Sequence, residues 1–214
     1  MYFPRVAILL STALLLAACK AEEVEIKLSG EDVVAAAAGQ VVSVEFKAEF
    51  GERFTSVDDE KRQMLEAIRL VLQDYFPEAD IELNIGSDGY SFDLEGEVLV
   101  SNQTPDQGTP WYVSAVIDSD GTGILVSLQP SATFGPFKNE LEDINSMIGP
   151  SEFQPVEFRF SADRGTVLVG GAYVDGRAEP FASLPMAGDT KRMRFSGGVW
   201  EDTGGGFLYL PGQE

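Results

Sequence analysis

Apolar residues alternate with polar residues in short segments along most of this 214-residue chain, and this pattern constrains the fold more than any other. Such alternation places the apolar side chains on one face of an extended strand, as for Val24, Ile26 and Leu28, which are separated by Glu25 and Lys27. The pattern recurs in residues 42–50, 81–85, 90–94 and 156–160, and residues 111–117, 124–128, 167–169 and 207–210 are further strand candidates. Residues 156–160 and 167–169 are expected to form a hairpin. The chain is therefore expected to form several half-buried strands joined by turns.

Two longer segments follow a helical period instead. Between Val57 and Phe76, apolar residues at positions 64, 68, 71 and 75 form one stripe, and Pro77 ends the segment. Between Pro136 and Ile148, positions 137, 141, 144 and 148 repeat that spacing. A shorter helical turn is expected over residues 33–38, after a capping box formed by Ser29 and Asp32. These elements predict an α+β fold, with an antiparallel sheet and two helices packed on it, in a single domain over residues 24–214.

The order strand, Phe-Gly, helix, strand, turn, strand occurs twice, in residues 40–101 and 123–178. The Phe-Gly step is Phe50-Gly51 in the first segment and Phe134-Gly135 in the second. Few other residues are identical between the two segments. One interpretation is an internal repeat of a βαββ unit, and the other is two such units without a common origin.

Composition excludes several classes of protein. The chain has no histidine and one cysteine, which excludes a Ser-His-Asp triad, an imidazole metal site, an internal disulfide and a thiolate cluster. Its net charge is −20, from 35 acidic and 15 basic residues. Nucleic acid is therefore not expected as a partner, because phosphate binding requires clustered Lys and Arg.

The N-terminus carries the features of an export signal. Arg5 precedes a run of apolar and small residues from Val6 to Leu16, which is shorter than the about 20 residues needed to span a bilayer. The sequence Leu16-Ala17-Ala18-Cys19 follows, and Cys19 is the only cysteine. An ordinary secretory signal in which Cys19 is incidental is one interpretation.

The other interpretation is that this segment resembles the lipobox of bacterial lipoproteins. The resemblance implies that residues 1–18 are a signal peptide, that Cys19 is acylated with palmitate or a similar chain, and that residues 19–23 tether the domain to a membrane. In lipoproteins of enteric bacteria, an Asp directly after the lipidated Cys typically retains the protein in the inner membrane. Lys20 at this position therefore favours the outer membrane. The start of the mature chain, Cys-Lys and then Val-Glu-Ile-Lys, weakly resembles small lipoproteins of uncharacterised bacterial and phage-associated families, which supply no functional motif.

The segment Val113 to Gly123, VSAVIDSDGTG, resembles the first motif of haloacid-dehalogenase-type phosphatases. The resemblance implies a parallel sheet, with Asp118 as nucleophile, Asp120 as acid/base and Mg²⁺ as cofactor. The alternative is a hairpin turn, because strand alternation resumes at Ile124. Asp118 and Asp120 are also weak candidates for a metal site.

Three further groups of residues are candidates for binding. Carboxylates on a predicted hairpin form either a cation-binding surface or a solvated face: Asp80, Glu82, Asp93, Glu95 and Glu97. Residues 191–194, Lys-Arg-Met-Arg, either contact phosphate or protect a strand edge. Four aromatic residues line either a ligand pocket or the core: Trp111, Trp200, Phe207 and Tyr209.

Together these features predict a lipid-anchored, non-catalytic protein of the cell envelope, on the periplasmic face of the outer membrane. It would act as a binding or structural module at the membrane surface, without a cofactor, and its partner would be an envelope protein or a small apolar ligand. The alternative is a metal-dependent phosphate hydrolase that uses Asp118 and Asp120.

Overall fold

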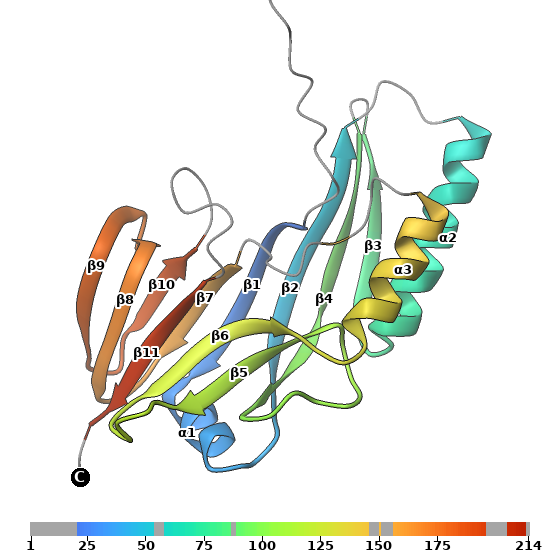
Figure 1. Ribbon diagram of the computed structural model, residues 1–214. Helices are drawn as coiled ribbons and strands as arrows, with labels where there is room; N and C mark the ends of the chain where they lie inside the picture. Colours follow the sequence, from blue (N-terminus) through green and yellow to red (C-terminus); the bar gives the residue numbers. More distant parts are fainter. Residues whose placement is uncertain are drawn as a thin grey trace, which may run out of the picture.

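The protein folds into a closed β-barrel with three helices, as seen in a computed structural model (Figure 1). The structure describes residues 21–53, 58–86, 89–145, 150, 156–195 and 205–212. Within these ranges, nine strands close into the barrel in the order β10-β7-β1-β2-β4-β5-β6-β11-β8, and β8 pairs with β10 to complete the ring. Strand β3 is added outside β4, and β9 outside β8.

The elements follow one another along the chain with these bounds: β1 Ala21–Ser29, α1 Gly30–Ala37, β2 Val42–Arg53, α2 Asp59–Tyr75, β3 Asp80–Ile85, β4 Gly89–Ser101, β5 Trp111–Ile117, β6 Ile124–Pro130, α3 Phe134–Ile144, β7 Val156–Ser161, β8 Gly165–Val174, β9 Arg177–Met186, β10 Thr190–Arg194 and β11 Gly206–Pro211.

Two of the strand pairings that close the barrel, which we call seams, are short. Strands β4 and β5 run parallel and pair only at Val100–Val113 and Ser101–Ser114. Strands β8 and β10 pair only at Val174–Met193 and Tyr173–Arg194. A third parallel pairing joins β1 to β7 over six residues. The β1–β7 pairing connects segments more than 120 residues apart, so the closure of the barrel cannot be predicted from a local sequence pattern.

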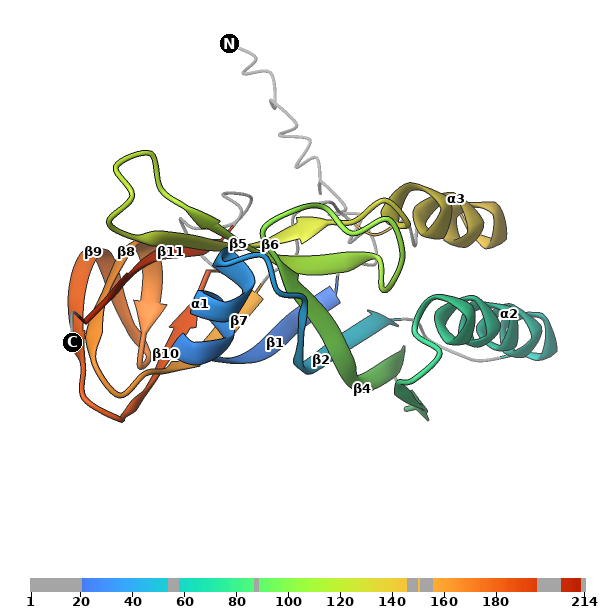
Figure 2. The same ribbon diagram turned by 90° about the horizontal axis from the view of Figure 1, so that it is seen from below.

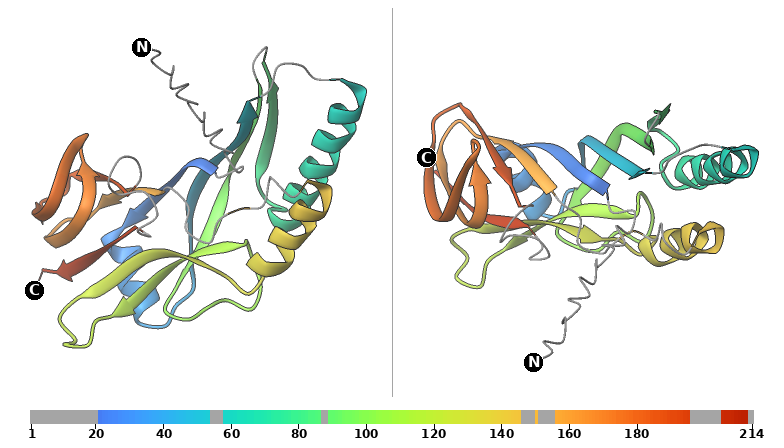
Figure 3. Two further views of the ribbon diagram at one scale, coloured as in Figure 1. Left: turned by 45° about the horizontal axis from the view of Figure 1, so that its top comes forward. Right: turned by 90° about the horizontal axis from the view of Figure 1, so that it is seen from above.

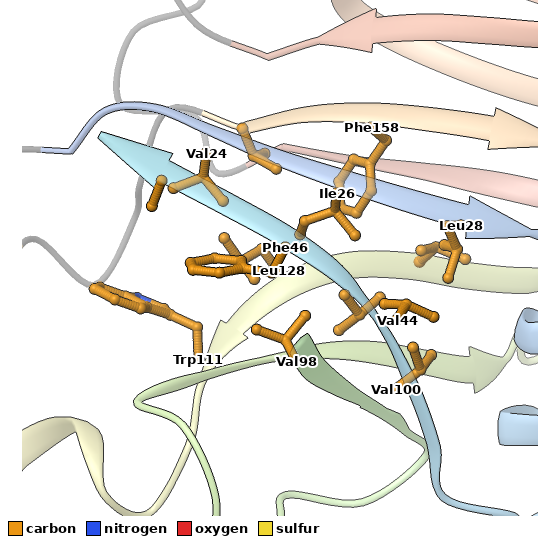
Figure 4. Close-up of a cluster of buried hydrophobic side chains, with 14 of the residues drawn as sticks. Val24, Ile26, Leu28, Val44, Phe46, Val98, Val100, Trp111, Leu128 and Phe158 are labelled. Atoms are coloured by element: carbon orange, nitrogen blue, oxygen red, sulfur yellow. The ribbon is translucent and has the colours of Figure 1, made fainter. Parts of the chain in front are cut away.

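The apolar residues of the alternating segments fill the interior. Val24, Ile26 and Leu28 from β1 point toward Phe46 from β2 and Phe158 from β7 (Figure 4). Each is at most 3% exposed. Phe158, Phe160, Phe207 and Tyr209 form a chain of aromatic contacts with centroids 5.0–5.4 Å apart. The interior is therefore a packed core of the kind found in small barrels.

Helix α1 closes the end of the barrel where β1 terminates (Figure 2). The capping box predicted from Ser29 and Asp32 is confirmed: the Ser29 hydroxyl accepts from the Asp32 N–H, and the Asp32 carboxylate accepts from the Ser29 N–H. A Cβ at Gly30 would lie 2.8 Å from the Tyr209 hydroxyl oxygen and 2.9 Å from the Ala162 Cβ. Glycine at this position thus lets the helix approach the barrel wall closely.

Helices α2 and α3 lie side by side where β4 and β5 separate (Figures 1 and 3). Phe76, at the end of α2, stacks on Phe46, and Phe137 of α3 meets both Phe76 and Trp111, with centroids 5.7–5.9 Å apart. The Tyr75 hydroxyl donates to the Glu140 carboxylate at 2.8 Å. Burial, with a smaller effect of this hydrogen bond, raises the pKa of Tyr75 to about 12. The helix pair thus supplies aromatic side chains to the core at one of the two short seams.

The expected α+β fold, with two helices on an antiparallel sheet, is wrong. The protein is mostly β, its sheet closes on itself and includes parallel pairs, and its helices fill gaps in the barrel instead of covering a sheet face. Alternation predicts which face of a strand is buried, but a barrel interior and the covered face of an open sheet produce the same pattern.

The internal repeat is not reproduced in strand pairing. The element order of residues 40–101, β2-α2-β3-β4, does recur in residues 123–178 as β6-α3-β7-β8. However, β3 and β4 form a hairpin, whereas β7 pairs with β1 and β10, and β8 with β9, β11 and β10. The two segments therefore play different roles in the barrel.

The two long helices are confirmed with different bounds. Helix α2 begins at Asp59, two residues after the predicted start, and its N-cap is Asp58, whose carboxylate accepts from the Lys61 N–H. Helix α3 begins at Phe134 and ends at Ile144. Val57, the predicted first residue of α2, and residues 146–149 lie outside the described residues, as do Cys19 and the predicted signal peptide. None of the helices in the described ranges is long and apolar enough to cross a membrane.

Candidate functional site

Asp118 lies in the tight turn between β5 and β6. Its carboxylate accepts the backbone N–H groups of Thr122 and Gly123 at 2.9 and 3.1 Å, and its own N–H donates to the Gly123 carbonyl. These contacts, that of Gly123 above all, hold the pKa of Asp118 below its ordinary value. Gly121 adopts a φ of 70°, which suits glycine. The carboxylate of Asp118 therefore stabilises the turn.

The turn contradicts the topology that the phosphatase resemblance implies. Strands β5 and β6 pair antiparallel from Trp111–Pro130 to Ile117–Ile124, so no parallel strand carries Asp118 to a helix. Within the described part of the chain, no group of three or more Asp, Glu, His or Cys is arranged to hold a metal ion. The sequence-based interpretation of a hairpin turn is confirmed.

The Asp118→Asn variant is expected to melt at a lower temperature than the wild type at neutral pH. A carboxyl with a depressed pKa in the folded state contributes stability above its unfolded pKa, and this contribution disappears as the pH falls through the folded value. The difference in melting temperature should therefore shrink between pH 5 and pH 2. Asp120→Asn in the same turn is the control, and an equal pH-dependent loss in that variant would contradict the role given to Asp118.

Five contiguous barrel strands carry the charged residues of the barrel wall. Each of β10, β7, β1, β2 and β4 contains charged side chains, and many of them pair across strands: Lys27 with Glu45, Lys47 with Glu95, Arg159 with Glu25, and Arg192 with Glu157. Glu157 is only 4% exposed, and it accepts two hydrogen bonds from Arg192 at 2.9 and 3.0 Å. We call this wall the charged face.

The acidic hairpin is an extension of the charged face. Asp93 lies opposite Glu49 on β2 and Glu82 on β3, so three carboxylates share one row. The Asn84 amide donates to Asp93, and Lys47 pairs with Glu95. Asp80, Glu82, Glu95 and Glu97 are exposed and Asp93 is half-buried, so these carboxylates lie on the solvent side of the sheet.

Each basic residue of the cluster at residues 191–194 has a partner elsewhere in the chain. Lys191 pairs with Asp189, Arg192 with Glu157, and the Arg194 guanidinium lies 5.0 Å from the Tyr173 ring centroid. Strand β10 is also not an edge, since it pairs with both β7 and β8. The cluster therefore supports neither a phosphate site nor edge protection.

The aromatic candidates for a ligand pocket belong to the core. Trp111, Phe207 and Tyr209 are at most 5% exposed, and Trp200 lies outside the described residues. The Trp111 indole N–H is buried without a hydrogen-bond partner among surrounding aromatic rings. Trp111 and Phe207 are therefore core residues, and Tyr209 reaches the surface only through its hydroxyl group.

An open groove of about 750 Å³ lies between α1, the β7–β8 turn and the end of β11. Its lining mixes apolar residues such as Val34 and Pro211 with the charged residues Glu31, Asp163 and Arg164. The Tyr209 hydroxyl at its floor donates to the Arg164 carbonyl at 2.9 Å. This mixture does not select a class of ligand.

The remaining wall of the barrel contains no charge. Strands β5, β6, β11 and β8 are neighbours in the ring, and none of them contains Asp, Glu, Lys or Arg. We call their outward side chains the uncharged face, which comprises Ser114, Val116, Leu125, Ser127, Thr166, Leu168, Gly170, Gly206, Leu208 and Leu210. Among the nine strands of the ring, charged residues are thus confined to β10, β7, β1, β2 and β4.

A continuous apolar row crosses the uncharged face. Val116 lies opposite Leu125, Leu125 opposite Leu208, and Leu208 opposite Leu168. Val116 and Leu125 are exposed, Leu125 at 53%, and the other two are half-buried. Beyond the row, β9 presents Phe181, which is 68% exposed and lies opposite Gly170. Exposed apolar residues in a contiguous group are typical of binding surfaces.

Sequence reasoning did not find this face because its strands come from three separate regions of the chain, 111–130, 165–174 and 206–211. The only available signal was the absence of charged residues in each of these strands. It predicts a common surface only once the strand pairing is known. No family model matches the chain, and no match was found among curated proteins.

Proposed function

We propose that this protein is a lipid-anchored, non-catalytic module of the cell envelope that binds a protein partner through its uncharged face. The observation that carries the proposal is the division of the barrel wall into a charged and an uncharged side. A solvent-facing wall with no functional constraint is expected to mix charges of both signs. A wall of four strands without any charge matches the core of a protein interface, where charged residues are depleted.

Membrane attachment rests on the sequence around Cys19. Strand β1 begins at Ala21, so only Lys20 separates Cys19 from the barrel. An acylated Cys19 would hold the barrel end at the start of β1 against the bilayer, and Lys20 favours the periplasmic face of the outer membrane. The phosphate hydrolase is not proposed, since the antiparallel turn removes its structural basis.

The Cys19→Ser variant is expected to lose both its lipid and its membrane association. Two or more acyl chains anchor a protein stably, because each buried methylene contributes ~0.8 kcal/mol. The measurement is membrane fractionation, with mass spectrometry of the N-terminal peptide. An unmodified Cys19 thiol in protein extracted from membranes would contradict the anchor.

Binding is tested by a photo-crosslinking amino acid placed at Leu125 in living cells. The matched control is Leu70 on α2, which is 51% exposed, close to the 53% of Leu125, but lies off the face. A discrete cross-linked species is expected from position 125 and none from position 70. Equal cross-linking at both positions, or none at 125, would refute the binding role of the face.

A further inference from the structure

We infer that the partner of the uncharged face is a second copy of this chain, which forms a two-fold dimer through that face. This inference rests on the proposed binding function and names its partner. Electrostatics favours it, because two copies that each carry a net charge of −20 repel one another wherever their charged faces meet. Contact through the uncharged face brings no charged side chain of its four strands into the interface.

The apolar row also suits a two-fold contact. An isologous interface uses the same patch on both subunits, so the patch must complement itself. The row of Val116, Leu125, Leu208 and Leu168 consists of aliphatic side chains that pack against their own kind. Beside it, Ser114 and Ser127 lie opposite each other, and Gly206 and Gly170 leave a low surface. In a two-fold dimer, the aliphatic row of one copy can therefore pack against the low surface formed by the serines and glycines of the other copy.

Edge-to-edge pairing through β9 is a poorer route to a dimer. Successive N–H groups of a strand point to opposite edges, and β9 contains prolines at an even and an odd position, Pro180 and Pro185. One of the two therefore removes a donor from the edge that does not pair with β8. Prolines of this kind block strand addition, which disfavours a dimer formed through the edge of β9.

The size of the face predicts a weak dimer. Four strands spaced ~4.8 Å apart, with three outward positions along each, cover roughly 20 Å by 20 Å. This is about half of the ~800 Å² that each partner buries in a standard interface. Dissociation on dilution is therefore expected, and a shared membrane would favour the dimer by raising the effective concentration.

The position of the face is compatible with two copies anchored in one membrane. The anchor would lie at the barrel end where β1 starts, whereas the uncharged face runs along the wall. A two-fold axis along the membrane normal then brings the two walls together and keeps both copies of Cys19 at the same bilayer.

The test is cysteine cross-linking of the full chain in cell membranes. The chain has no cysteine other than Cys19, so Leu208→Cys adds one reporter thiol on the face. A short bismaleimide should give a dimer composed only of this chain, at least tenfold more abundant than with Leu70→Cys or with the parent. Adding Leu125→Glu to the reporter should lower the dimer at least tenfold, and adding Leu70→Glu should leave it unchanged.

Equal dimer from Leu208→Cys and Leu70→Cys, or a dimer insensitive to Leu125→Glu, would overturn the inference. If position 125 photo-crosslinks to a different protein and no self-crosslink forms, self-association is refuted while the proposed binding function stands. If neither cross-link forms, both are refuted. Thermal melting of Leu125→Glu should match that of Leu70→Glu, which separates loss of contact from loss of folding.

Discussion

Ile68→Asp is expected to unfold the barrel or to bring it close to unfolding. Ile68 is 5% exposed and lies on α2 between Leu65 and Leu72, all within the main core. Aspartate there buries an unpaired carboxylate or must take up a proton, and either costs several kcal/mol. Since a domain of this size is stable by about 5–15 kcal/mol, the loss consumes much of the total. The measurement is denaturant unfolding followed by circular dichroism.

Leu70→Asp is the matched control for this prediction. Leu70 lies on the same helix two residues later, and it is 51% exposed. The control should unfold near the wild-type midpoint, since its carboxylate stays in water. Wild-type-like unfolding of Ile68→Asp would show that the α2 stripe does not pack on the core. Ile144, at the end of the corresponding stripe on α3, is half-buried, so Ile144→Asp should cost less than Ile68→Asp.

The sequence was informative wherever structure depends on neighbours in the chain. Alternation correctly placed Val24, Ile26 and Leu28 inside, and the capping box at Ser29 marked the start of α1. The β3–β4 and β5–β6 hairpins follow from turns with glycine and aspartate between alternating runs. Each of these features is decided within about ten residues.

The sequence was uninformative wherever pairing joins distant segments. The short turn after β7 suggested a hairpin with β8, but β7 pairs instead with β1, more than 120 residues earlier. Strand β9 was not predicted, because it contains two prolines and its inward stripe of Ala182, Leu184 and Met186 is only partly buried. The uncharged face also depends on long-range pairings, those of β11 with β6 and β8. The turn motif at Asp118 is contiguous in sequence, so it was recognised as a candidate site and the face was not.

Phe137→Ala is expected to destabilise the protein by about 3–5 kcal/mol, the usual cost of removing a buried phenyl ring. Phe137 is fully buried and contacts Tyr75, Phe76 and Trp111, with ring centroids 5.1–5.8 Å apart. These rings fill the space where β4 and β5 pair at only two positions, so few backbone hydrogen bonds can compensate for the lost contacts.

The location of Phe137 gives this prediction a second readout. A cavity at this seam should speed amide hydrogen exchange in β5 and α3 more than in β1 and β2, which pair over a longer register. Phe181→Ala is the control, because Phe181 is 68% exposed on β9 and its loss should leave both stability and exchange unchanged. Uniform acceleration in all strands of the Phe137→Ala variant would show that the barrel opens as one unit, and that the helix pair does not secure the seam between β4 and β5.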